Sequence, residues 1–208
     1  ALLLIYNNMI DLLLQSPIAF VFVAVSLVIA ISVHEAAHAY AADHLGDPTP
    51  SLQGRLTLNP ASHLDPIGTL MLLFFGFGWG KPVQFDPYNL KNPTRDAAII
   101  SIVGPLSNII MALLATVLFR TVLPSQMLVP FIQINVLLAV LNMIPVHPFD
   151  GFKVVGGLLP GGHAEEWYSL QRYWWMFLLL LIVPVGGSSM LSQILNFFVT
   201  PIMQVLVG

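Results

Sequence analysis

The sequence predicts an all-α membrane protein, a polytopic bundle of about five to six transmembrane helices with a re-entrant loop or β element between the first two core helices. Of its 208 residues, 57% are hydrophobic and only 8% are charged. A soluble domain needs roughly a quarter of its residues charged to cover its surface, so lipid must be the solvent for much of this chain. Several apolar stretches are also long enough to cross a hydrocarbon core about 30 Å thick. We expect residues 1–208 to form one domain.

The apolar stretches predict where the helices lie. The core, about residues 17–155, is expected to hold three spans, at 17–42, 97–123 and 125–146. Residues 66–78 are apolar but form a stretch of only about 13 residues, which suits a re-entrant or half-buried segment better than a crossing. The remainder, about residues 170–207, holds two apolar stretches at 174–185 and 190–207 that are expected to form a helical pair.

Composition excludes several classes of function. The chain has no cysteine, which excludes disulfides and thiolate metal sites, and its net charge of −3 is too small to suggest nucleic-acid binding. Residues 1–14 are apolar but lack a basic leader and a cleavage site, so we do not interpret them as a secretory signal.

The basic residues predict an orientation in a cell membrane that the chain crosses several times. If 17–42 and 125–146 run in the same direction and 66–78 does not cross, all but one basic residue lie at one side. These are Arg55, Lys81, Lys91, Arg95, Lys153 and Arg172, against Arg120 alone. The positive-inside rule makes that side cytoplasmic. The same arrangement places His34 and Asp150 at like ends of their helices.

His34-Glu35-Ala36-Ala37-His38 fits the H-E-x-x-H pattern of zinc hydrolases. Residues four apart share one helix face, so both imidazoles can reach one ion. Glu35 can then take a proton from metal-bound water and return it to the leaving amine. Ionisable groups within an apolar span are expensive and mark functional sites. The alternative is that these side chains only bind one another between helices or reach from a helix end towards water.

A catalytic zinc typically has three protein ligands and one open position, so a third ligand must come from elsewhere. Four side chains near the membrane are candidates: Asp150, His147, His63 and Asp65. Asp150 is the best of them because it stands just beyond the end of a span that runs parallel to the first.

Three motifs together resemble the site-2 protease family of intramembrane metalloproteases. They are His34-Glu35-x-x-His38, Gly104-Pro105-Leu106-Ser107-Asn108, and Asn142-x-x-Pro145-x-x-Pro148-x-Asp150-Gly151, in the order that the family has. The stretch from Arg55 to Gly68 resembles compact prokaryotic members without a PDZ domain. The resemblance implies one zinc ion held by His34, His38 and Asp150, and ligand-bearing helices that flank the Gly104-Pro105 helix. It also implies cleavage of a peptide bond in or near the transmembrane helix of a protein substrate, for example an anti-sigma factor or a signal-peptide remnant.

Other residues carry open alternatives. Asn142 is expected near the site, where it either hydrogen-bonds the substrate or developing oxyanion, or joins two helices. The loop 75–85, with Gly78, Trp79 and Gly80, either accepts an unwound substrate as an added strand or simply makes a tight turn. His147 replaces the first proline of a Pro-Pro pair that the family often has. It is interpreted as a partner of Asp150, an occasional ligand, or a loop residue facing water. His63 either approaches the site or forms a turn-stabilising pair with Asp65.

Two rival functions remain. A non-proteolytic membrane protein could bind or transport a metal at this site, although a transporter is expected to line its path with ionisable groups from more than two helices. An inactive relative could serve as a binding scaffold, but the intact ligands and Glu35 argue against that interpretation.

Overall fold

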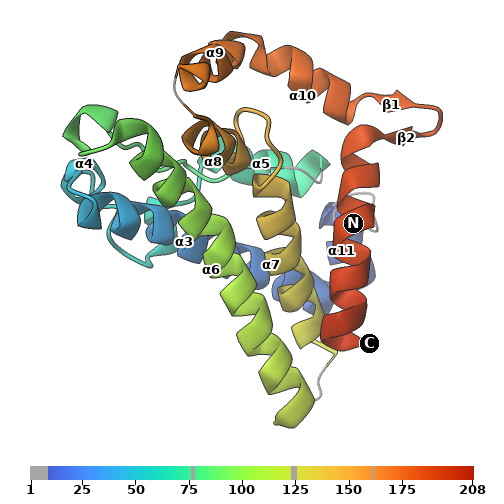
Figure 1. Ribbon diagram of the computed structural model, residues 1–208. Helices are drawn as coiled ribbons and strands as arrows, with labels where there is room; N and C mark the ends of the chain where they lie inside the picture. The colour runs from blue at the N-terminus through green and yellow to red at the C-terminus, as the bar shows by residue number, and fades with distance from the viewer. Residues whose placement is uncertain (1–8, 76–77, 123–125, 161) are drawn as a thin grey trace.

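The computed structural model describes residues 9–75, 78–122, 126–160 and 162–208 (Figure 1). Its helices are α2 (Met9–Gln15), α3 (Pro17–His44), α4 (Thr49–Leu52), α5 (Pro66–Phe75), α6 (Pro93–Thr121), α7 (Leu128–Asn142), α8 (Asp150–Leu158), α9 (His163–Ser169), α10 (Trp174–Ile182) and α11 (Met190–Val207). Short 3-10 turns lie at Pro60–Ser62, Pro87–Asn89 and Leu170–Tyr173, and a two-stranded hairpin joins β1 (Pro184–Val185) to β2 (Ser188–Ser189).

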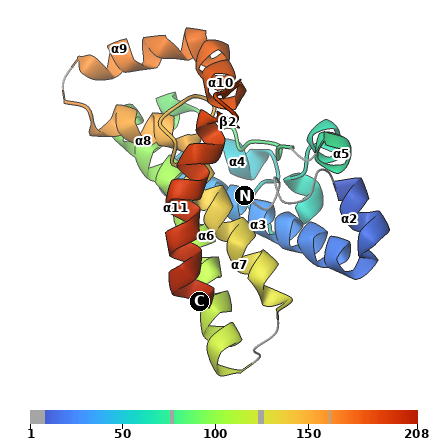
Figure 2. The same cartoon turned by 90° about the vertical axis from the view of Figure 1, so that its right-hand side faces the viewer.

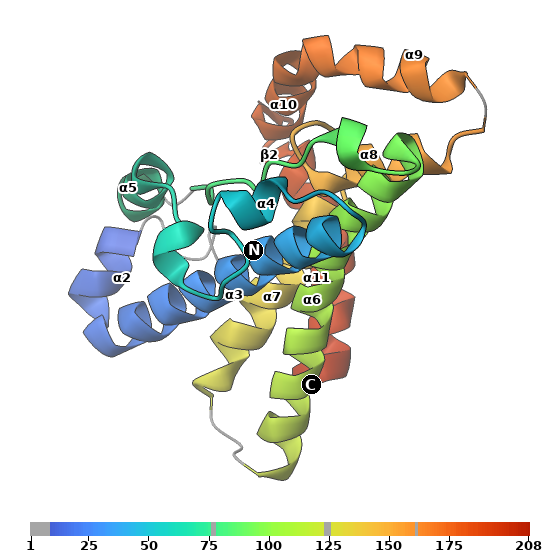
Figure 3. The same cartoon turned by 90° about the vertical axis from the view of Figure 1, so that its left-hand side faces the viewer.

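Helices α6, α7 and α11 run side by side, and α3 crosses α6 and α7 steeply (Figures 2 and 3). Helices α8, α9 and α10 lie at the end of the bundle where α6 begins and α7 ends (Figure 1). Helix α8 packs against α6. This packing places Asp150, the first residue of α8, close to α3. The crossing of α3 and α6 therefore lies directly beside the start of α8.

Small side chains allow α3 and α6 to cross closely. Ala30, Ala36 and Ala39 on α3 are at most 2% exposed, and Gly104 on α6 is also buried. In lipid, close backbone approach of this kind supplies the packing that a hydrophobic driving force supplies in water. A second apolar cluster joins α6, α7 and α11 through Ala112, Ala115, Ile132, Val136, Leu137, Leu195 and Val199.

The predicted class, a helical membrane bundle, is confirmed. Three described helices, α3, α6 and α11, are long and apolar enough to cross a membrane, and α7 is a shorter apolar helix of 15 residues. The structure differs from the predicted bounds where proline intervenes. The span expected at 125–146 is helical only from Leu128 to Asn142 because Pro145 and Pro148 follow, and the stretch 174–185 is helical only to Ile182, ahead of Pro184.

A segment that we call the strap, residues 78–86, crosses the region between α5 and α6. Within the described residues it shows little β structure: one antiparallel bridge joins Gly80 to Leu64. The positions 76–77 of the predicted loop lie outside the described residues. Two buried side chains hold the strap. Arg55 donates to the carbonyls of Ser62 and Lys81, and the Asp47 carboxylate accepts the Asp86 N–H at 2.7 Å.

Candidate metal centre and active site

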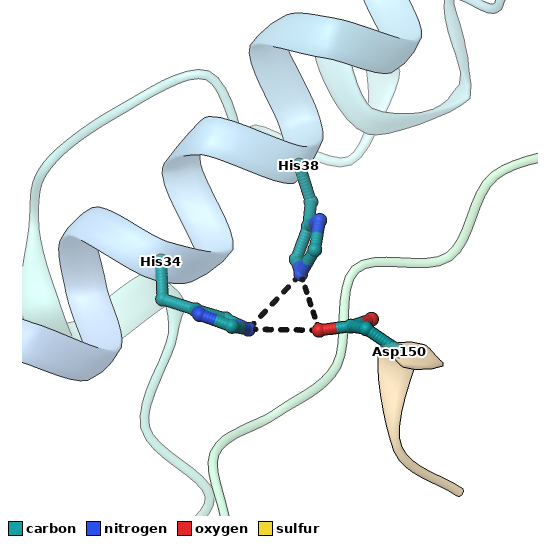
Figure 4. A group of neighbouring side chains, drawn as sticks. All are labelled: His34, His38 and Asp150. Atoms are coloured by element: carbon teal, nitrogen blue, oxygen red, sulfur yellow. Dashed lines mark hydrogen bonds and ion pairs between the residues drawn. The ribbon is translucent and has the colours of Figure 1, made fainter. Parts of the chain in front are cut away.

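Three side chains converge between α3 and the start of α8 (Figure 4), beside Gly104 of α6. His34 and His38 are one turn apart on α3, and Asp150 is the first residue of α8. His34 Nε2 and His38 Nε2 are 3.0 Å apart and lie 3.1 Å and 3.2 Å from the same Asp150 carboxylate oxygen. The structure thus brings together the three residues that the sequence singled out as ligands.

A chain of amide hydrogen bonds fixes the orientation of the His34 imidazole. Backbone carbonyls only accept, so Asn135 must present its NH₂ group to the Phe131 carbonyl and its oxygen to Asn108. Asn108 then donates from its own NH₂ group to Asn135 and to the Ala30 carbonyl, and its oxygen accepts the Nδ1–H of His34 at 2.7 Å. The proton of His34 therefore sits on Nδ1, and Nε2 faces the cluster with a lone pair.

The same reasoning applies to His38. Its Nδ1 lies 2.7 Å from the Ile100 carbonyl, which can only accept, so Nδ1 carries a proton and Nε2 carries the lone pair in the neutral ring. Gly104 makes room for both rings. A Cβ atom at that position would lie 2.4 Å from His38 Cε1 and Nε2 and 2.8 Å from His34 Cε1. The close approach of α6 thus requires glycine here.

With both imidazoles neutral, the three convergent atoms form a set that a cation would stabilise. Two imidazole lone pairs and a carboxylate oxygen repel one another, and both imidazoles are more than 90% buried. A divalent ion would satisfy all three atoms at once. Tetrahedral zinc at about 2.0–2.1 Å from each ligand keeps the ligand atoms about 3.3 Å apart, close to the 3.0–3.2 Å seen here. The donor set, two nitrogens and one oxygen, fits zinc and leaves a fourth position open.

Glu35 follows His34 on α3 and faces the strap. Its carboxylate accepts the Val83 N–H at 2.9 Å and lies 3.9 Å from a guanidinium nitrogen of Arg55. A carboxylate held by one N–H and one cation keeps further lone pairs for water or substrate. Glu35 and the three cluster residues line one cavity of about 370 Å³.

The residues predicted to contact substrate line the same cavity: Asn142, Gly78, Trp79 and Gly80. One amide N–H of Asn142 is used, because it donates to the Leu138 carbonyl one turn earlier at 3.0 Å. Gly78 also has a packing role, since a Cβ atom there would lie 2.2 Å from the Gly68 carbonyl oxygen. The strap and α5 are therefore in close backbone contact beside the cavity.

His147 and His63 lie elsewhere. His147 packs against Phe152 and Trp174 and accepts a hydrogen bond from Gln171, and neither of its ring nitrogens bonds Asp150 among the described residues. Burial lowers the pKa of His147, and the charge of Lys153 lowers it further. His147 is therefore a packed loop residue, and its Nδ1 is buried and unpaired among the described residues instead of facing water.

His63 is fully buried under the strap rather than in the cavity lining. Its Nε2 atom lies 2.7 Å from the Thr57 carbonyl, and its own carbonyl accepts the Lys81 N–H. The expected partner Asp65 instead accepts the Gly68 N–H at 2.7 Å. His63 therefore joins the 57–63 loop to the strap.

Sequence reasoning gave no role to several residues that shape the site. Asn108 was part of a quoted motif and Asn135 a polar residue in an apolar span, and either feature could have indicated a buried hydrogen bond. The sequence predicts no place at the site for Arg55 or Lys153. Lys153, one turn after Asp150, lines the cavity with Glu35.

A helical membrane protein with an H-E-x-x-H helix and an aspartate completing a three-ligand cluster has the organisation of a metal-dependent hydrolase. Three relatives carry the name "Putative zinc metalloprotease". YwhC of Bacillus subtilis is 35% identical over 201 residues, which cover 89% of this chain and 91% of YwhC. Rip2 of Mycolicibacterium smegmatis is 28% identical over 147 residues, 64% of this chain and 55% of Rip2. MJ0611 of Methanocaldococcus jannaschii is 30% identical over 93 residues, 43% of this chain and 49% of MJ0611.

The chain belongs to the site-2 protease family, as its likeness to YwhC across most of both chains shows. No family model and no solved structure matches it.

Proposed function

We propose that this protein is an intramembrane zinc endopeptidase that hydrolyses a peptide bond in or near the transmembrane segment of a membrane-protein substrate. One observation carries the proposal: two imidazole lone pairs and the Asp150 carboxylate converge within 3.2 Å, with Glu35 in the same cavity. The names of the relatives support the zinc and protease parts of it.

In this proposal, His34, His38 and Asp150 hold one zinc ion per chain. When bound there, zinc would polarise a water molecule and the scissile carbonyl. Glu35 takes a proton from the attacking water as the new C–O bond forms, and it returns that proton to the amine nitrogen as the C–N bond breaks. Asn108 and the Ile100 carbonyl keep both histidines in the tautomer that this chemistry requires.

The strap supplies a place for an unwound substrate. A transmembrane helix hides its carbonyls in its own hydrogen bonds, so the peptide must be extended before water can attack. The strap runs past Glu35 at the cavity edge, and within the described chain its β structure is limited to one bridge. We propose that substrate adds to it as a strand.

The cavity end of the bundle faces the cytoplasm in this proposal, and the protein crosses the cell membrane several times. Arg95 lies in the first turn of α6 near the cavity end, whereas Arg120 lies in its last turn. The chain has no cysteine, so single cysteines at Lys91 and at Arg120 can be labelled selectively with an impermeant maleimide. Labelling of the Lys91→Cys protein from the periplasmic side would contradict the orientation.

The direct test compares cleavage and zinc content in one preparation. The purified protein is reconstituted with a single-span model substrate, and products are mapped by mass spectrometry. Glu35→Gln is expected to retain one zinc per chain and to lose cleavage by roughly 10²- to 10⁴-fold, the usual contribution of a general base. The matched control is Glu165→Gln, an exposed glutamate of α9, which should cleave at the wild-type rate. Undiminished cleavage by Glu35→Gln would refute the role of Glu35.

A further inference from the structure

Lys153 places a cation in the cavity that the chemistry described so far does not use. It lies three residues after Asp150 on α8, on the same helix face. Its ammonium nitrogen is 4.6 Å from the centre of the Phe85 ring, which belongs to the strap. Lys153, Glu35 and Asp150 all line the cavity.

The ammonium group keeps its hydrogen-bond donors available. Among the residues that the structure describes, Lys153 makes no hydrogen bond and no ion pair, and its contact with Phe85 is a cation–π contact. The pKa of Lys153 is lowered overall, because the effect of burial exceeds that of the Asp150 and Glu35 charges, which raise it and favour the ammonium form. A partly buried ammonium is costly unless something offsets its desolvation. Here the Phe85 ring contacts the ammonium, and Lys153 lines the cavity.

We propose that Lys153 is a further catalytic residue whose ammonium donates a hydrogen bond to the scissile carbonyl oxygen and stabilises the negative charge that forms there. The inference deepens the proposed endopeptidase function and rests on it. As the water oxygen bonds to the carbonyl carbon, an electron pair moves onto the carbonyl oxygen. That pair returns to the carbon when the C–N bond breaks. Lys153 keeps its proton throughout, so the proton path through Glu35 is unchanged.

A preorganised cation suits this role better than the neighbouring amide does. Asn142 donates one amide N–H to the Leu138 carbonyl, so a single side-chain N–H remains for the substrate. Lys153 offers three donors and a full charge. Donors that are already in place when charge develops stabilise a transition state more than they stabilise the uncharged substrate. Removing Lys153 should therefore slow turnover more than it weakens substrate binding.

The test uses Lys153→Met and Lys153→Arg in the reconstituted full chain, with Lys91→Met, an exposed lysine, as the matched control. Lys153→Met is expected to lower kcat by about 10²-fold, as loss of an oxyanion donor typically does, while KM changes less than about twofold. Lys153→Arg should recover part of the loss. Zinc content and thermal unfolding temperature should match the wild type in all three variants.

A second readout needs no turnover. A peptidyl phosphonate with the substrate's sequence mimics the charged tetrahedral intermediate, and its affinity should fall by the same factor as kcat/KM in Lys153→Met. The affinity of uncleaved substrate, measured in a Glu35→Gln background, should not change. Equal losses for phosphonate and substrate, a wild-type kcat, or loss of zinc or thermal stability in Lys153→Met would each overturn the proposal.

These outcomes separate this inference from the proposed function. If the wild-type protein cleaves nothing, the endopeptidase proposal fails, and the catalytic role of Lys153 fails with it. If the wild type cleaves and Lys153→Met cleaves equally well, only the role of Lys153 is refuted.

Discussion

Replacing Asn108 with leucine should weaken zinc binding although Asn108 is not a ligand. Asn108 is fully buried, and its oxygen accepts the Nδ1–H of His34 at 2.7 Å. Leucine has a similar size and cannot accept a hydrogen bond. It would leave a buried N–H of His34 unpaired, and it would also deprive the Asn135 oxygen of its donor.

The expected size of the effect follows from these contacts. An unpaired buried polar group costs about 1–3 kcal/mol, and loss of a hydrogen bond to a ligating histidine lowers metal affinity by roughly 10- to 100-fold. Water cannot replace the amide at a position with no exposed surface, so we expect the upper half of that range. An affinity loss of about 30- to 100-fold corresponds to about 2–2.7 kcal/mol.

The assay is competition for zinc against a chromophoric chelator, with the protein in detergent at constant pH. Ser107→Ala is the matched control, because the Ser107 hydroxyl donates only to the Gly104 carbonyl of its own helix. The control should bind zinc as the wild type does. A zinc dissociation constant for Asn108→Leu within twofold of the wild-type value would refute the assignment of the His34 tautomer and its partner.

Two more substitutions test the architecture around the site. Gly104→Ala should abolish zinc binding without unfolding the helix, because the added Cβ would stand 2.4 Å from the His38 ring, and zinc analysis against the open position Gly162→Ala checks this. Asp47→Asn should destabilise the fold by about 1.5–3 kcal/mol at pH 7, since its charged carboxylate accepts several hydrogen bonds. Burial alone raises the pKa of Asp47, but hydrogen bonds led by those from Thr49 lower it below its ordinary value. The wild-type advantage should therefore be complete above about pH 4 and shrink as the pH falls through the folded-state value. Unfolding temperatures of both proteins at pH 7 and pH 3 measure it, and an advantage that grows in acid would contradict the assignment.

Local spacing made part of the site predictable. His34 and His38 share a face by helix geometry alone. Asp150 is predicted because it follows a span expected to run in the same direction as the first, although α3 in fact crosses α7 steeply. The structure brings all three within 3.2 Å. The pairing of His34 with Asn108 could not be predicted in the same way. It joins residues 74 positions apart, and it depends on how closely α6 crosses α3.

The contacts of Glu35 with distant residues could likewise not be predicted from the sequence. The sequence predicts its place beside the ligands, because that follows from the helix. Its contact with Val83 depends on the path of the strap, and its contact with Arg55 depends on the loop that carries Arg55. The buried side chains of Arg55 and Asp47, which lie in other loops, fix the path of the strap. Glycine-rich loop composition permits many such paths and selects none of them.

The most direct test of the metal centre is X-ray absorption at the zinc edge on the purified wild-type protein, with zinc counted per chain. The site described here predicts one zinc ion with two imidazole nitrogens and oxygen ligands at about 2.0–2.1 Å, and a lower zinc content in Asp150→Ala. A protein that holds no zinc, or a spectrum with fewer than two imidazoles, would contradict it.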